Sequence, residues 1–168
     1  MKKFLAVTLL VVPLVGCGTK TAPVTSVTPA QVAADLTGLV NTLQAIVPQV
    51  EAAAPNALTA AQKASLTSDL ANAKTALAGF VAGMPATAGA SRAAVIDGYL
   101  NDIIGVAATV APPPYNTAFV AAEVIMPEVE AFVNQYLPSS VTTAPRMAAM
   151  SMTPDEARRV LHIPVVHP

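Results

Sequence analysis

Residue types that commonly bind metal ions or transfer protons are few in this chain. Its two histidines are His162 and His167. In an extended segment, residues at an odd spacing point to opposite sides, so these two imidazole rings are poorly placed to share a metal ion. Helical bundles that hold two iron atoms use Glu-x-x-His pairs, and the sequence contains none. We therefore expect no metal site and no cofactor.

A second group with metal-binding chemistry consists of Met147, Met150 and Met152. Thioether sulfurs are soft ligands that suit Cu(I), so the M-x-x-M-x-M pattern is compatible with copper handling. Methionine is also an adaptable apolar side chain that fills gaps in cores and at docking surfaces. Three interpretations stay open: copper binding, local packing or docking, and no role. Packing or docking is favoured over copper.

Four carboxylates are the other candidates for chemistry, because paired acids can cleave glycosidic bonds. Glu123 and Glu130 lie seven residues apart, and Asp97 and Asp102 lie on the preceding predicted helix. A sugar-cleaving site would need aromatic walls, but the chain has three tyrosines and no tryptophan. Residues 28–137 contain no histidine or cysteine, so a nucleophile–base pair would have to recruit the tail. We expect no catalytic residues unless these carboxylates share one buried cleft.

Four amphipathic helices are predicted in residues 28–137. The first begins at Thr28-Pro29, a capping residue followed by proline at the first helical position. The second begins at Thr59, with Gln62 placed to complete a capping box. The third begins at Ser91, and the fourth follows the stop at Pro112-Pro113-Pro114. Short breaks between helices favour antiparallel neighbours, so we predict an all-α fold, an antiparallel four-helix bundle.

Each predicted helix has one apolar stripe, in which steps of three and four residues alternate. The stripes contain Val32, Leu36, Leu39, Leu43, Ile46 and Val50; Leu66, Leu70, Ala73, Leu77, Phe80 and Met84; Ile96, Tyr99, Ile103, Val106 and Val110, widened by Leu100 and Ile104; and Phe119, Ala122, Met126, Val129, Val133 and Tyr136. Gly79 and Gly83 fall within the helical pattern of the second stripe. We interpret them as sites of close helix packing rather than as a phosphate-binding loop.

Two of these helices contain an internal proline, Pro48 in AIVPQVEA and Pro127 in VIMPEVEA. Each proline removes one helical hydrogen bond, so we expect each helix to kink or to split there. The similar octets, 79 residues apart, raise the possibility of an internal repeat. The flanking residues do not sustain it, and chance similarity is favoured.

Residues 138–168 are predicted to be a linker and a C-terminal tail with a short helix at 154–161. The stretch Thr153-Pro154-Asp155-Glu156 carries a capping residue, an initial proline and acids in the first turn. We place Ala157, Val160 and Leu161 on one face of this helix, followed by an extended apolar end, Ile163–Val166. Docking of the tail on its own bundle is favoured. The alternatives are presentation to an envelope protein partner and, less favoured, plain disorder.

The front of the chain reads as an export signal. Lys2 and Lys3 precede an apolar run, Phe4 to Val15, which is too short to span a bilayer and ends at the chain's only cysteine, Cys17. The segment Leu14-Val15-Gly16-Cys17 resembles the lipobox of bacterial lipoprotein precursors. This resemblance implies that residues 1–16 are a cleaved signal peptide and that Cys17 carries lipid. The alternative is an ordinary secretory signal with a buried cysteine.

The same resemblance indicates a location. In Gram-negative lipoproteins an aspartate just after the cysteine favours retention in the inner membrane, and here Gly18 and Thr19 follow Cys17. We therefore expect anchoring at the periplasmic face of the outer membrane. Residues 17–27 are then a flexible lipidated tether, since they are small, polar and proline-bearing.

Charge and hydropathy limit the remaining function classes. Without Lys2 and Lys3 the chain has seven basic and ten acidic residues, a net charge of −3, which argues against nucleic-acid binding. The mean hydropathy of +0.56 is raised by the signal and by alanine. We expect a lipid-anchored periplasmic protein with a structural or protein-binding role. The alternatives are a membrane-perturbing accessory of envelope remodelling or lysis, and, less favoured, an enzyme.

Overall fold

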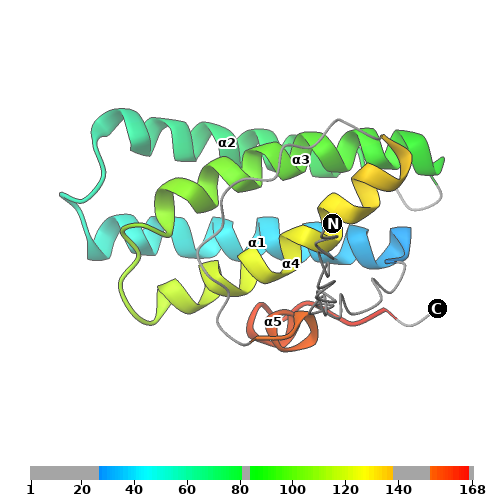
Figure 1. Ribbon diagram of the computed structural model, residues 1–168. Coiled ribbons are helices and arrows are strands. Elements are labelled where there is room, and N and C mark those ends of the chain that lie inside the picture. Colours follow the sequence, from blue (N-terminus) through cyan, green and yellow to red (C-terminus); the bar gives the residue numbers. More distant parts are fainter. Residues whose placement is uncertain (1–26, 81–83, 138–151, 167–168) are drawn as a thin grey trace, which may run out of the picture.

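The computed structural model describes residues 27–80, 84–137 and 152–166. The described residues form four long helices, α1 (Pro29–Ala53), α2 (Ala60–Ala78), α3 (Ala86–Ala107) and α4 (Tyr115–Tyr136), and one short helix, α5 (Pro154–Val160). The long helices run up and down alternately and pack along one another (Figure 1). The prediction of an all-α antiparallel four-helix bundle with a short C-terminal helix is confirmed.

Two of the predicted helix starts are confirmed in atomic detail. The Thr28 hydroxyl accepts a hydrogen bond from the Gln31 backbone N–H at 3.2 Å, and Pro29 occupies the first turn of α1. At α2 the Gln62 side chain accepts from the Thr59 N–H at 2.8 Å, and the Gln62 N–H donates to the Thr59 hydroxyl at 3.3 Å. Both caps satisfy amides that have no partner within the helix.

The third helix starts earlier than predicted. α3 begins at Ala86, directly after Pro85, and the predicted cap residue Ser91 lies inside it. The Ser91 hydroxyl donates to the Thr87 carbonyl at 3.1 Å, the bond that serine makes when it lies within a helix. Pro85 is the N-cap residue and no side chain caps this start, so the prediction of a start at Ser91 was wrong.

The second helix ends earlier than its apolar stripe suggested. α2 stops at Ala78, and Gly79 is its C-terminal cap rather than a residue within the helix. Phe80 and Met84 follow the helix and are partly buried. Gly83 lies outside the described residues. Gly79 therefore ends the helix instead of lying within it. The expected close packing is present, because a Cβ atom on Gly79 would overlap the guanidinium group of Arg92 on α3.

Neither internal proline splits its helix. α1 continues through Pro48 and α4 continues through Pro127. Both proline residues are exposed, so each ring lies on the side of its helix that faces away from the bundle core. The bundle core on the opposite side keeps each helix continuous despite the missing hydrogen bond.

The core is made by the apolar stripes of the four long helices, with two shifts of register. In α1, Val47 is buried and the predicted Ile46 is only partly buried. In α3, Leu100 and Ile104 are buried, whereas Tyr99 and Val106 are partly exposed, as is Val110, which follows the helix. α3 packs against α2, α4 and α1, so a wider face than a single stripe is covered. No helix among the described residues is long and apolar enough to cross a membrane.

Candidate functional site

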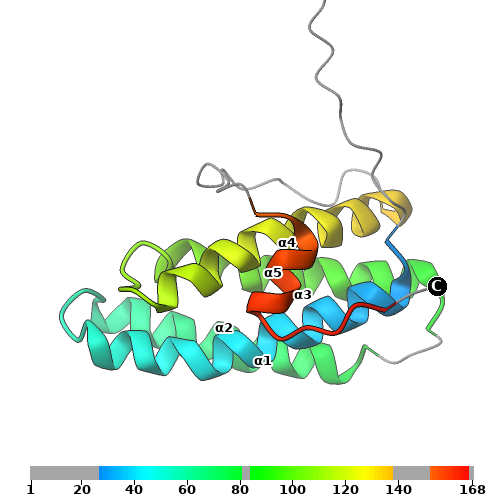
Figure 2. The same ribbon diagram turned by 90° about the horizontal axis from the view of Figure 1, so that it is seen from below.

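The C-terminal tail lies against the outside of the bundle. α5 crosses α4 and α1, and the extended residues after it run along α1 (Figure 2). Ala157, Leu161 and Ile163 are buried and belong to the same apolar core as the long helices. The prediction that the tail docks on its own bundle is confirmed. Val160 is 39% exposed, so its predicted placement on the same buried face as Ala157 and Leu161 was wrong.

A buried arginine joins the tail to the bundle. Arg158 is paired through Nε and Nη2 with the two oxygens of Asp35, at 2.9 and 2.8 Å. Its Nη2 also donates to Glu128, and its Nη1 donates to Asp155 Oδ1 at 3.2 Å. These carboxylates come from α1, α4 and α5 respectively. The two-pronged pairing fixes both the position and the plane of the guanidinium group.

The backbone of the tail is held by polar side chains of α1. Gln31 Oε1 accepts from the Val166 N–H at 2.5 Å, and its Nε2 donates to the Pro164 carbonyl at 3.4 Å and to Asp35 Oδ1 at 2.7 Å. The Thr42 hydroxyl donates to the Leu161 carbonyl at 3.3 Å. Gln31 therefore connects the hydrogen bonds of the extended segment with the buried ion pair.

Close approach between the tail and α1 depends on a glycine. A Cβ atom placed on Gly38 would lie 2.2 Å from Ile163 Cγ1. Any larger residue at position 38 would force Ile163 away from the helix. We call residues 153–166 the docked tail. The surface that receives it is the tail-binding face, made by Gln31, Asp35, Gly38 and Thr42 of α1 and Glu128 of α4.

The turn between α5 and the extended segment is a Schellman cap. The Ile163 N–H donates to the Arg158 carbonyl at 2.8 Å, and the His162 N–H donates to the Arg159 carbonyl at 3.3 Å. His162 has a positive φ of 55°, the left-handed conformation that this cap requires. The cap reverses the chain, and as a result Ile163 reaches Gly38 while Arg158 reaches Asp35. Glycine usually occupies this position, so its use by histidine was not apparent from the sequence.

The pKa values around Arg158 reflect crowding of negative charge. The pKa of Arg158 is raised, chiefly by its hydrogen bonds to Asp35. The pKa of Glu128 is raised above 4.5, because burial of the carboxylate outweighs its attraction to Arg158. Asp35 and Asp155 raise it further by repulsion. Burial therefore disfavours the charged form of the Glu128 carboxylate even beside Arg158.

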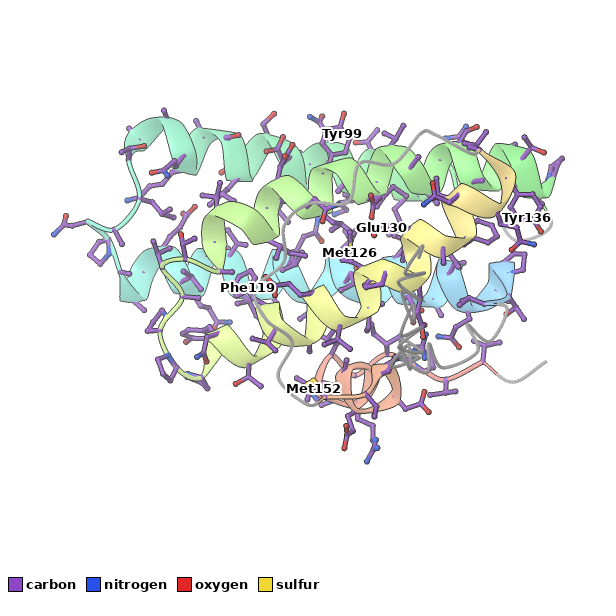
Figure 3. The ribbon with its side chains drawn as sticks, in the orientation of Figure 1. Tyr99, Phe119, Met126, Glu130, Tyr136 and Met152 are labelled. Atoms are coloured by element: carbon purple, nitrogen blue, oxygen red, sulfur yellow. The ribbon has the colours of Figure 1, made fainter. Side chains whose placement is uncertain are left out.

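The four carboxylates that the sequence offered for catalysis differ in burial. Asp97 and Glu130 are buried, Glu123 is partly buried and Asp102 is exposed. Asp97 accepts a hydrogen bond from Asn101 Nδ2 at 3.2 Å, one turn along α3. Glu130 lies on α4 one turn after Met126 (Figure 3). Within the described ranges, no group of three or more histidine, cysteine, aspartate or glutamate residues is arranged to hold a metal ion.

Only some of the other candidate residues lie within the described parts of the chain. Cys17, Met147, Met150 and His167 lie outside the described residues. Met152 lies beside α5 and packs against the apolar core (Figure 3), as the packing interpretation expects of it. His162 is exposed and acts as the cap residue described above.

Sequence reasoning missed the residues that form the ion pair. None of the sequence patterns gave a role to Arg158, Asp35, Gln31 or Glu128. One signal was present: Gln31 and Asp35 lie four residues apart, and they directly precede Val32 and Leu36 of the apolar stripe of α1. Polar side chains within an apolar face require buried partners, because an unpaired buried charge is costly.

Comparison with known proteins does not connect this site or this bundle to any of them. No family model, no curated protein and no solved structure matches the chain.

Proposed function

We propose that the chain is a lipid-anchored protein of the bacterial cell envelope, with a structural or protein-binding role. The observation that carries this proposal is the segment Leu14-Val15-Gly16-Cys17 at the end of a short apolar run. A thiol at this position is the acceptor for diacylglycerol in lipoprotein precursors. Cleavage before Cys17 and acylation of the new amine then give several acyl chains, which together anchor a protein stably.

The anchor leads into the bundle through a short tether. Residues 17–27 precede α1, and fully extended they reach at most roughly 36–40 Å. The bundle is thereby held near the membrane surface, at the periplasmic face of the outer membrane. Gly18, in the place of an inner-membrane retention aspartate, supports that location.

The protein-binding role is supported by the outer side of the docked tail. Among the described residues, the exposed large apolar side chains are Val95, Val160 and Val165, and two of these belong to the tail. Apolar side chains that stay exposed on a docked segment are available to a partner, here an envelope protein. The tail is therefore our candidate for the partner-binding surface, and no catalytic role is assigned.

Replacement of the lipidated cysteine tests the anchoring. We expect Cys17→Ser to accumulate as uncut precursor or to appear in the soluble periplasm, whereas Thr19→Ser, a matched change two residues later, stays in the membrane fraction. Gly18→Asp should shift the protein from the outer to the inner membrane. Normal cleavage and membrane residence of Cys17→Ser would overturn the proposal.

The partner-binding surface needs a separate measurement. Wild-type chain and the variant Val160→Asp/Val165→Asp are used to capture proteins from an envelope extract. Partners bound by wild type and lost by the variant support the role of the tail. Identical capture by both chains would assign partner binding to another surface.

A further inference from the structure

The tail-binding face recognises its ligand by three separate features. Asp35 and Glu128 select a guanidinium group, and Asp35 does so in the two-pronged geometry that lysine cannot reproduce. Gly38 admits a β-branched aliphatic side chain at close range. Gln31 binds one backbone carbonyl and one backbone N–H, which sets the register of an extended segment. Together these features describe a peptide-binding site.

The segment that fills the site is connected to the bundle through one stretch of chain. Residues 138–151 join α4 to the docked tail, and their fourteen residues extend to at most roughly 46–50 Å. Arg158 and Asp35 are 123 positions apart in the sequence, and Val166 and Gln31 are 135 positions apart. These contacts depend on the tail sequence, and none requires the tail to belong to the same chain.

We propose that the tail-binding face also accepts the docked tail of a second copy of this chain, so that two copies associate by exchanging residues 153–166. The second copy is the occupant because it carries the arginine, the left-handed turn and the aliphatic residue in the spacing that the face matches. Exchange forms the same ion pair and the same apolar contacts between chains and needs no new interface. This inference goes beyond the proposed anchoring and holds whether or not Cys17 carries lipid.

Two variants of the full chain separate the face from the tail. Arg158→Glu keeps the face and repels its own tail, because it sets a fourth carboxylate among Asp35, Glu128 and Asp155. Gly38→Leu keeps the tail and blocks the face, since its side chain occupies the position of Ile163. Leucine is a good helix former, so α1 is retained. The Arg158→Glu chain therefore offers a free tail-binding face, and the Gly38→Leu chain offers a free tail.

The test is the molar mass of each variant and of their equimolar mixture, measured by light scattering after size exclusion. We expect each variant alone to be monomeric and the mixture to contain a heterodimer at the same total concentration. Hydrogen exchange of the heterodimer should show protection of the tail from the Gly38→Leu chain and none of the tail from the Arg158→Glu chain. A monomeric mixture of two folded variants would overturn the proposal and leave docking within one chain as the only mode.

A labelled synthetic peptide of residues 152–166 gives a second measurement. It should bind the Arg158→Glu chain and fail to bind the Gly38→Leu chain. The same peptide carrying Arg158→Ala should bind about thirtyfold more weakly, because Asp35 is left without its partner. If Arg158→Glu does not fold, Ile163→Asp replaces it as the chain with a non-docking tail. Absence of peptide binding to a folded variant with a free face also counts against the proposal.

Discussion

α2 and the docked tail are two outer elements of the same bundle, and they are held in different ways. α2 has 19 residues, of which only Leu66, Leu70 and Ala73 are buried, and within the described ranges no ion pair joins it to another helix. The docked tail is shorter, yet it buries Ala157, Leu161 and Ile163 and a complete ion-pair cluster around Arg158. α2 packs mainly against α3, whereas α5 packs against α4. Non-directional apolar contact holds α2, whereas directional hydrogen bonds and ion pairs of Arg158 set the position of the docked tail.

This difference shows how a short segment with few apolar side chains, such as the docked tail, can still be held in a single position. Apolar contacts such as those of Leu66 and Leu70 are non-directional, so they tolerate small shifts of a helix. An arginine paired with both oxygens of Asp35 permits one arrangement only, since a shift leaves a buried charge without a partner. We therefore expect substitutions in α2 to act on the stability of the whole bundle. Substitutions in the tail should act on docking alone.

The largest effect is expected in α2. Leu70→Asp places a charge in the thin apolar contact with the core and should lower the free energy of unfolding by about 3 kcal/mol or more. Denaturant unfolding followed by far-UV circular dichroism measures it. Ala71→Asp is the control, because Ala71 is exposed and adjacent. Equal losses in the two variants would mean that α2 does not depend on its apolar stripe.

A somewhat smaller effect is expected when Arg158 is removed. Breaking a buried pair typically costs about 3–5 kcal/mol, but undocking of the tail returns Asp35 to water and limits the loss to the docking free energy. For Arg158→Ala we predict fast hydrogen exchange throughout residues 153–166, with α2 and α3 still protected. Arg159→Ala, at an exposed position, is the control. A protected tail in Arg158→Ala would show that apolar contact alone suffices for docking.

The stability of the protein should depend on pH in a direction set by the raised pKa of Glu128. Because the pKa of Glu128 is raised in the folded protein, the native state takes up a proton before the unfolded state does. Stability should therefore increase as the pH falls from neutrality through the folded pKa of Glu128, and this gain should level off below about pH 4.5, the unfolded value. Denaturant midpoints measured between pH 7 and pH 4.5 test this. In Glu128→Gln that rise should be absent, and an unchanged rise would assign it to another group.

A second carboxylate acts in the opposite direction at lower pH. The pKa of Glu156 is lowered by its hydrogen bonds to Thr153 in the capping box, so its contribution is present above pH 4.5 and is lost as the pH falls through the folded pKa. The two groups therefore act in separate pH windows. Glu156→Gln should remove the loss at low pH and leave the rise caused by Glu128.

The smallest effect is expected at the turn that directs the tail. His162 is left-handed, a conformation that costs an ordinary residue about 1–2 kcal/mol and glycine almost nothing. His162→Val should weaken docking by about 1 kcal/mol, since branching at Cβ is poorly tolerated there. His162→Gly should keep docking or strengthen it slightly. Exchange rates of the tail amides measure both, and equal rates in the two variants would contradict a role for the turn geometry.

Much of the bundle was predictable because its causes are local. The caps at Thr28 and Thr59 and the stop at Pro112-Pro113-Pro114 act over a few residues, and the start and end signals of helices lie within one turn. The misplaced start of α3 shows the limit of such signals, because serine serves equally as a cap and as an interior residue. At α2 the apolar spacing continued past Ala78, and only the structure shows that the helix ends there.

The sequence by itself determined the number and type of the helices, most of their buried faces and the capping box of the short C-terminal helix. It also carries the lipobox on which the proposed anchoring rests. Only the tertiary structure decided that Arg158, Asp35, Glu128 and Gln31 come together and that Gly38 lies beneath Ile163. The physical reason is distance along the chain: caps and periodic stripes arise from neighbours within about one helical turn, roughly four residues. A buried ion pair joins residues whose proximity exists only after the helices have packed.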